Sequence, residues 1–282
     1  MPSSSHSPAM TEFQFFQFRP SPALAPFVEL IWGARGPGEL TREAVLPNGA
    51  AELMINFGPR QKVLAYGDRS VNEDFARAWL AGIQDQPLVI GSPEGCDHLG
   101  VRFRPGGAHA FFDLSMESVT NQVVELDLLI GRTAEGLRDR LGEARTDEAR
   151  ARAVEAWLLE RRWGVHPYHA MVRRAIDLAR YSQFHLGVGD LCEHLGLSNR
   201  HLITQFRRIV GTTPKTILRI ERFHTVVHSV REQAVADWTH LAYRFGFADQ
   251  SHLVREFHRF AGVTPSAFLA RRTPDGSHLI VD

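Results

Sequence analysis

The chain has 282 residues, 44% of them hydrophobic and 23% charged, so it can bury a sizeable core in two domains and is not disordered over most of its length. Two cysteines, Cys96 and Cys192, are too few for a disulfide scaffold or a four-thiolate zinc site. The sequence shows neither a run of about 18 apolar residues nor a secretory leader, so we expect a cytoplasmic protein without a membrane partner.

The net charge of zero hides a difference between the two parts of the chain. Residues 1–165 contain 17 Lys and Arg against 22 Asp and Glu, a balance of −5, whereas residues 166–282 contain 15 against 10, a balance of +5. Eleven of the 14 histidines lie in the second part, which becomes more positive as the pH falls through their usual pKa of about 6.5. We therefore expect the second part to attract a polyanion.

The first part has the pattern of short strands. Residues 1–12 lack hydrophobic periodicity and are interpreted as a disordered tail. Turn residues at 47–49, 58–59, 67–68 and 105–107 separate runs in which apolar residues alternate. These runs include Phe13 and Phe15; Leu53, Ile55 and Phe57; and Leu99, Val101 and Phe103. The pattern predicts a β-rich barrel or sandwich.

Helical spacing replaces the alternation after Gly107, around 110–114, 134–141 and 154–161. Thr146, followed by two acidic residues, is the predicted N-cap of a helix reaching Arg162. Gly164 and Pro167 interrupt the pattern, so we expect a domain boundary at 163–167. The predicted fold class is α+β: a β-rich domain ending in helices over 13–163, an all-α domain over 166–272, and a tail over 273–282.

An internal repeat marks the second part. Residues 201–214 recur as residues 252–265 with seven identities in 14 positions. Upstream, Leu191 and Gly196 match Leu241 and Gly246. Two copies are too few for a solenoid, so the repeat predicts a pair of similar helical units. The identical pairs are His201 and His252, Leu202 and Leu253, Phe206 and Phe257, Arg208 and Arg259, Gly211 and Gly262, Thr213 and Thr264, and Pro214 and Pro265.

The sequence of each unit predicts a short helix, a tight turn and a second helix. The short helices, over 190–195 and 237–245, end at glycines that suit the left-handed backbone after a helix. Ser198 and Asp249 are predicted N-caps of the second helices. Apolar spacing predicts the core-facing residues, which are Leu202, Phe206, Ile209, Leu253, Phe257 and Phe260. The opposite, polar faces carry Arg200, Thr204, Arg207, Ser251, Arg255 and His258.

A helix-turn-helix with a basic outer face is the geometry that presents a recognition helix to the major groove of DNA. A connecting helix is predicted over 215–230, and its 16 residues would span about 24 Å. That length is compatible with two recognition helices entering major-groove segments about 34 Å apart.

Residues 166–282 resemble the DNA-binding domain of AraC-type (AraC/XylS) transcriptional regulators. In that family the second unit has Gly-Phe, a short polar stretch, Phe, Gly and Pro, and the first unit has counterparts. The matching residues are Gly246, Phe247, Gln250, Ser251, Phe257, Gly262 and Pro265, and Gly196, Ser198, Phe206, Gly211 and Pro214. The resemblance implies base contacts by Arg200, Ile203 and Thr204 in the first recognition helix and by Gln250, Ser251, Val254 and Arg255 in the second.

Several of these assignments have alternatives. Ile203 and Val254 cannot hydrogen-bond a base edge, so they would contact a thymine methyl group or read nothing. Gln250 could be a helix cap instead of an adenine contact, and any single arginine could touch only phosphate. His201 and His252 are expected to have a structural or phosphate-binding role, not a metal-binding one.

The first part more weakly resembles an uncharacterised domain that precedes this module in some regulators, through residues 47–58 (PNGAAELMINFG) and 99–112 (LGVRFRPGGAHAFF). That implies effector sensing or dimerisation. The partners expected for the whole chain are double-stranded DNA, RNA polymerase, a small-molecule effector and a second copy of the chain, with no cofactor.

Two enzyme classes are alternatives to a regulator. A metal-dependent β-barrel enzyme needs several converging ligands, and residues 1–165 contain only three histidines, His6, His98 and His109. A DNA-alkylation repair protein needs more thiolates than two cysteines supply. We therefore expect a regulator without enzyme activity. A first domain that serves only for dimerisation stays open.

Overall fold

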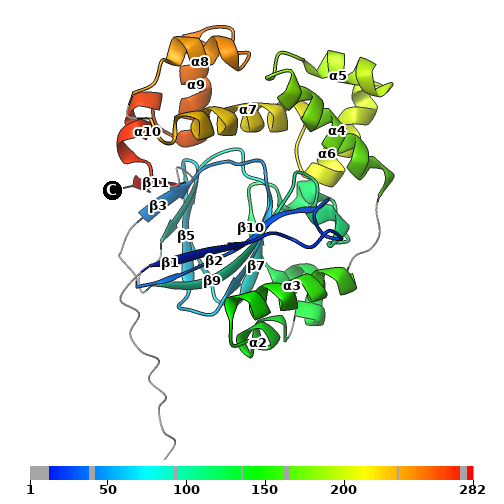
Figure 1. Cartoon of the computed structure of the whole chain (residues 1–282), viewed down its shortest axis with the longest axis vertical. Coiled ribbons are helices and arrows are strands. Elements are labelled where there is room, and N and C mark those ends of the chain that lie inside the picture. Colours follow the sequence, from blue (N-terminus) through cyan, green and yellow to red (C-terminus); the bar gives the residue numbers. More distant parts are fainter. Residues whose placement is uncertain are drawn as a thin grey trace, which may run out of the picture.

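The computed structural model describes residues 13–37, 42–91, 95–134, 136–161, 166–233, 235–273 and 278–281. The tail expected over 1–12 and most of the boundary expected at 163–167 lie outside the described residues. A β-rich region is followed by helices and then by an all-helical region, so the α+β prediction is confirmed (Figure 1). No helix in the described ranges is long and apolar enough to cross a membrane.

The β-rich region consists of two antiparallel sheets that stay separate over the described residues, which favours the sandwich over the closed barrel. The six-stranded sheet has the order β1 (Gln14–Phe18), β2 (Val28–Gly36), β9 (Cys96–Phe103), β4 (Glu52–Asn56), β7 (Ala78–Ala81) and β10 (Val123–Glu125). The five-stranded sheet has the order β11 (His278–Val281), β3 (Arg42–Val45), β8 (Leu88–Gly91), β5 (Gln61–Tyr66) and β6 (Arg69–Phe75).

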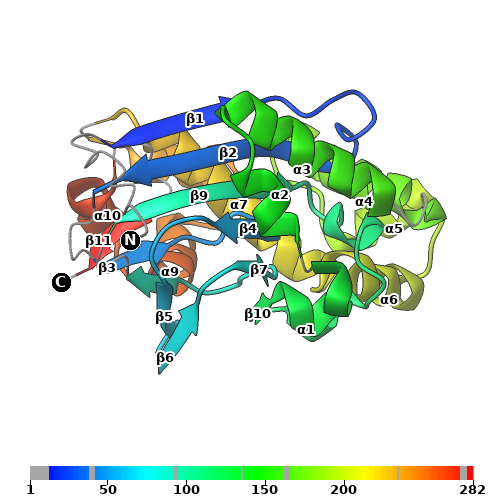
Figure 2. The ribbon, with the colours of Figure 1, turned by 90° about the horizontal axis from the view of Figure 1, so that it is seen from below.

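One face of the six-stranded sheet is covered by the helices that follow it in the chain. Leu53, Ile55 and Val101 share a core with Val154 and Trp157 of α3 (Asp147–Arg161). The predicted cap of α3 is present, because Thr146 Oγ1 accepts a hydrogen bond from the Ala149 amide at 3.2 Å. Figure 2 shows α2 and α3 lying across this sheet. The shorter helical segments are η1 (Ala108–Ala110), η2 (Met116–Val119), α1 (Leu126–Ile130), η3 (Gly131–Ala134) and α2 (Leu137–Gly142).

The helical region is organised around its longest helix, α7, with the other helices gathered at the two ends of that helix (Figure 1). Fully buried aromatic side chains, among them Phe206, Phe223 and Phe257, hold it together. The helices are α4 (Pro167–Tyr181), α5 (Val188–Leu195), α6 (Asn199–Val210), α7 (Pro214–Val230), α8 (Trp238–Arg244), α9 (Gln250–Ala261) and α10 (Pro265–Arg271).

The segment predicted as a tail, 273–282, contains a strand instead. β11 pairs antiparallel with β3 of the amino-terminal region, with His278 opposite Val45 and Leu279 opposite Ala44. Leu279 is buried, and His278 Nδ1 lies 3.0 Å from Glu43 Oε2. The chain therefore returns to the first region after completing the helical one. Four residues are too short a run to signal a strand whose partner is more than 200 positions away.

The two regions also share one hydrophobic core. Ala44, Leu46 and Ile83 of the β-rich region belong to the same buried cluster as the helical core. The turn predicted at 105–107 lies directly on α6: a Cβ added to Gly106 would be 2.8 Å from Ile209 Cγ2. Gly106 has a φ of +77°. This turn therefore requires glycine for two reasons: the left-handed backbone and the close approach to α6. The β-rich region is thus docked against the first helical unit.

Candidate nucleic-acid interface

The two helical units share one local design, as the repeat predicts. A glycine with left-handed backbone follows each short helix, Gly196 with φ of +65° after α5 and Gly246 with φ of +68° after α8. The next amide closes each turn in the same way: Leu197 N–H donates to the Cys192 carbonyl at 3.0 Å, and Phe247 N–H to that of Ala242 at 2.9 Å. Glycine makes this conformation accessible without steric cost, so both turns have the same shape.

The second helix of each unit begins at its predicted cap. Ser198 Oγ accepts a hydrogen bond from the His201 amide at 3.2 Å, and Asp249 Oδ1 accepts one from the His252 amide at 2.6 Å. The equivalence continues past these helices, because Pro214 and Pro265 each open the following helix behind a capping threonine. The sequence repeat is therefore a structural repeat.

Burial divides α6 and α9 into two faces. The six predicted core residues, Leu202, Phe206, Ile209, Leu253, Phe257 and Phe260, are at most 1% exposed. Of the nine residues predicted to face DNA, none is buried. Ile203 and Val254 are half-buried, whereas Arg200, Thr204, Arg207, Gln250, Ser251, Arg255 and His258 are exposed. The fold brings these nine side chains to the outer faces of two equivalent helices, and their contact with DNA stays a prediction.

Some of these side chains already have partners within the protein. Gln250 Oε1 accepts a hydrogen bond from Thr239 Oγ1 of α8 at 2.8 Å, so Gln250 links the two helices of its unit and does not cap α9. Thr204 Oγ1 donates to the Arg200 carbonyl at 2.9 Å. Arg207 faces the β-rich region, where Glu117 Oε1 lies 3.5 Å from its Nε.

A buried ion pair fixes α9 on the connecting helix. Glu256 is 8% exposed and accepts hydrogen bonds from Arg219 Nε at 2.6 Å and Nη2 at 2.5 Å. Burial alone would raise the pKa of Glu256, but the hydrogen bonds and charge of Arg219, with the charge of Arg222, lower it below its usual value. Arg222 also donates to the Gly246 carbonyl at 2.8 Å. These residues were not predicted from the sequence; the signal that could have found them is the acidic Glu256 in a basic helix.

A second buried pair fixes the first unit. Glu221 of α7 is 3% exposed and accepts hydrogen bonds from Arg180 Nη2 at 2.6 Å and Nε at 2.9 Å. Burial raises the pKa of Glu221, and the guanidinium of Arg180 opposes that rise. Both nitrogens of Arg180 donate to the same oxygen, Glu221 Oε2, whereas the Arg219–Glu256 pair uses both carboxylate oxygens. One pair ties α7 to α4, which shares a buried core with α6, and the other ties α7 to α9.

The repeated histidines have structural contacts. His252 Nδ1 accepts a hydrogen bond from the Ala248 amide at 3.2 Å, and its ring lies edge-on to Phe247. The ring of His201 packs against Tyr168 of α4. Over the described ranges, no group of three or more His, Cys, Asp or Glu residues is placed to hold a metal ion.

Comparison with protein families gives two matches. Residues 191–271 match a helix-turn-helix domain model, which runs from α5 through α10. Residues 191–271 are an AraC-type DNA-binding domain. Residues 16–125 match a domain of unknown function, DUF6597, which covers most of the β-rich region in front of the AraC-type domain. Comparison with curated proteins gives no match.

Comparison with solved structures gives several matches of low sequence identity. ToxT from Vibrio cholerae is 10% identical, with 92% of this chain and 97% of that chain covered and a TM-score of 0.46. The AraC-like transcriptional activator CuxR is 15% identical, with 76% of this chain and 80% of that chain covered and a TM-score of 0.32.

Proposed function

We propose that the chain regulates transcription by inserting α6 and α9 into adjacent major-groove segments of one DNA duplex. The proposal rests on one observation: α6 and α9 present equivalent exposed faces and are connected by a single helix, α7. The 17 residues of α7 span about 26 Å at 1.5 Å per residue, and the recognition helices extend the reach beyond its ends. Major-groove segments on one side of B-form DNA recur about every 34 Å.

The side chains on the two faces suit different parts of the duplex. Arg200 and Arg255 can each form two hydrogen bonds with a guanine edge, and Gln250 can do so with adenine once it leaves Thr239. Ile203 and Val254 offer only apolar contact, which suits a thymine methyl group. We assign Thr204 and Ser251 to either a base edge or phosphate, and Arg207 and His258, nearer the ends of the helices, to phosphate.

The β-rich region receives the regulatory role in this proposal. It is docked on the AraC-type domain through the shared core and β11, so a ligand or a second copy bound there can alter how the recognition helices are presented. We expect the DNA-bound regulator to act on RNA polymerase, in the cytoplasm. No enzyme activity is proposed.

The test is a selection of binding sites from random duplex DNA with the full chain, followed by footprinting. The expected result is two protected major-groove segments on one side of the duplex, about 10 base pairs apart. Inserting about 5 base pairs, half a helical turn, would place the second segment on the opposite side of the duplex. Because α7 cannot span that separation, the affinity should fall to that of a single half-site. A single protected segment, or affinity unchanged by the insertion, would refute the use of both helices.

A further inference from the structure

One loop of the β-rich region reaches both helical units. Residues 82–87 connect β7 to β8. Near one end of the loop, Ile83 is buried in the helical core, and a Cβ added to Gly211, which follows α6, would lie 3.2 Å from Ile83 Cγ2. At the other end Pro87 is buried, and a Cβ added to Gly262, which follows α9, would lie 3.9 Å from Pro87 Cγ. Because Gly211 and Gly262 are equivalent in the repeat, the loop meets α6 and α9 at the same point.

Polar groups strengthen each of these contacts. Thr120 Oγ1 lies 2.7 Å from the Gly211 carbonyl oxygen and 3.2 Å from that of Met116, and the shorter contact joins the two regions. On the side of α9, Asp85 Oδ2 lies 3.8 Å from Arg259 Nη2, in a partly exposed ion pair. The end of each helix therefore has both an apolar and a polar contact with the β-rich region.

The loop is held in one shape by a neighbouring segment, residues 119–122. Asn121 N–H donates to the Ile83 carbonyl at 2.9 Å, and Asn121 Oδ1 accepts a hydrogen bond from the Asp85 amide at 2.9 Å. The four steps from Ile83 to Pro87 span at most about 14 Å, at up to about 3.6 Å per residue. The ends of α6 and α9 are therefore held at a short, fixed separation by one rigid piece of the β-rich region.

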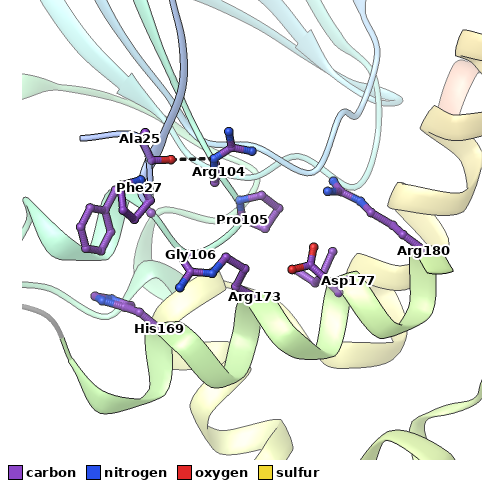
Figure 3. A pocket seen from close by; sticks show the side chains of 12 residues that line it. Ala25, Phe27, Arg104, Pro105, Gly106, His169, Arg173, Asp177 and Arg180 are labelled. Atoms are coloured by element: carbon purple, nitrogen blue, oxygen red, sulfur yellow. Dashed lines mark hydrogen bonds between the residues drawn. The ribbon is translucent and has the colours of Figure 1, made fainter. Parts of the chain in front are cut away.

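The junction between the two regions is looser beside α4. A cleft of about 250 Å³ separates residues 104–107 from one face of that helix. Figure 3 shows Arg104 and Pro105 on one wall of the cleft and Arg173 and Asp177 on the other. Because the cleft leaves room between the two regions, α4 is held less closely there than α6 is at its end.

We propose that residues 82–87 and 119–122, which we call the brace, set the separation of α6 and α9 and so decide which spacing of the two DNA segments the chain accepts. A connecting helix such as α7 can bend, and two units held on it alone could change their separation. The brace adds a second bridge between them, through close-packed contacts that do not yield easily. The inference rests on the proposed function, because it assumes that both helices enter the same duplex.

Spacing on DNA is a strict measure of this separation. One added base pair moves the second segment by about 3.4 Å along the duplex and turns it by about 35° around the axis. Two units at a fixed separation cannot follow such a change, so one of them loses its contacts. Units that can move relative to each other follow it at a smaller loss of affinity.

The test compares duplexes that differ only in spacing. The selected duplex, and versions with one base pair inserted or removed between the two segments, are titrated with the full chain by fluorescence anisotropy. The unaltered chain should bind the altered spacings at least about tenfold more weakly. Thr120→Val and Ile83→Ala should each reduce this penalty to about threefold or less, because each removes a contact between the brace and the end of α6.

Ser118→Ala is the matched control for Thr120→Val. The Ser118 hydroxyl donates to the Ser115 carbonyl at 2.8 Å, within its own segment, so this variant should keep the full penalty. Valine retains the branched shape of threonine, so Thr120→Val still gives a result if Ile83→Ala does not fold. The proposal is overturned if Thr120→Val binds the altered spacings with the same penalty as the unaltered chain, or if Ser118→Ala relaxes the penalty equally.

A measurement without DNA separates this inference from the proposed function. Spin labels at Glu193→Cys on α5 and Tyr243→Cys on α8, both exposed positions, report the distance between the two units when Cys96 and Cys192 are replaced by alanine. The distance distribution should be narrow with the unaltered brace and broader in Thr120→Val. If the unaltered chain protects only one DNA segment, the proposed function fails and the labels alone decide the brace. Equal widths would then overturn it.

Discussion

Glu117 of the β-rich region lies 3.5 Å from Arg207 of the first recognition helix, measured from Oε1 to Nε. Both side chains are about half exposed, so the pair is a surface contact. Its position gives it significance, because a carboxylate faces the helix end that is expected to meet a DNA phosphate. In this arrangement the β-rich region competes with DNA for Arg207 and places a negative charge beside the polyanion.

Replacing that carboxylate should therefore strengthen DNA binding. We expect Glu117→Gln to raise the affinity of the full chain for its selected duplex by up to about fivefold, since exposed ion pairs are worth up to about 1 kcal/mol. Fluorescence anisotropy at fixed salt measures the change. Glu148→Gln, an exposed carboxylate on α3, is the control and should have no effect. Unchanged or weaker binding by Glu117→Gln would show that the contact does not oppose DNA.

Arg255 is the sharpest test of sequence readout. If it pairs with a guanine, Arg255→Ala should weaken binding by about 1–3 kcal/mol and relax the preference at one base pair. Arg152→Ala, which replaces an exposed arginine of α3, should leave both properties unchanged. A uniform loss on all sequences, with a smaller dependence of affinity on salt, would instead identify Arg255 as a phosphate contact.

β11 should contribute measurably to the stability of the whole chain. Leu279 is 2% exposed and Ile280 is 49% exposed, so the two neighbours form a matched pair. Leu279→Ala should lower the free energy of unfolding by about 2–5 kcal/mol through lost burial and a cavity. Ile280→Ala should change it by less than about 0.5 kcal/mol. Denaturant titration followed by circular dichroism compares them, and equal effects would mean that β11 is not seated in solution.

Acid should weaken the junction between the two regions. His109 Nδ1 of η1 lies 3.1 Å from His169 Nε2 of α4, so one ring donates to the other, and protonating the accepting nitrogen would break the contact. Burial lowers the pKa of both to about 4, and nearby positive groups add to the effect, including His166, Arg173 and Arg208. The charge of Asp113 opposes it at His109.

The direction of the pH effect follows from these values. Below a pH of about 6.5 the two histidines bind protons in the unfolded chain but stay neutral in the folded one. Their contribution to the free energy of unfolding is therefore complete above that pH and is lost as the pH falls toward 4. His169→Gln should flatten the dependence of the unfolding midpoint on pH between these limits. His240→Gln, at an exposed position, should retain it. An unaltered slope in His169→Gln would exclude the pair as its source.

Much of the helical region could be predicted because its signals are local. Gly196, Gly246, Ser198 and Asp249 specify turns and caps through their own backbone and nearest neighbours, and apolar spacing alone separates the buried from the exposed face of α6 and α9. Helix α4 was not singled out, although Val172, Ile176 and Ala179 have helical spacing. Helix α4 lies outside the internal repeat, so nothing in its sequence linked it to a function.

The sequence by itself determined the elements, the duplicated units and the outer faces that they present, because periodicity, capping and glycine act within a few residues. Only the tertiary structure decided that β11 joins β3, that Glu256 and Glu221 lock the units to α7, and that Arg104 and Arg173 share a cleft. Each of these contacts joins residues from tens to hundreds of positions apart. Such contacts depend on how whole elements pack, which no local pattern encodes.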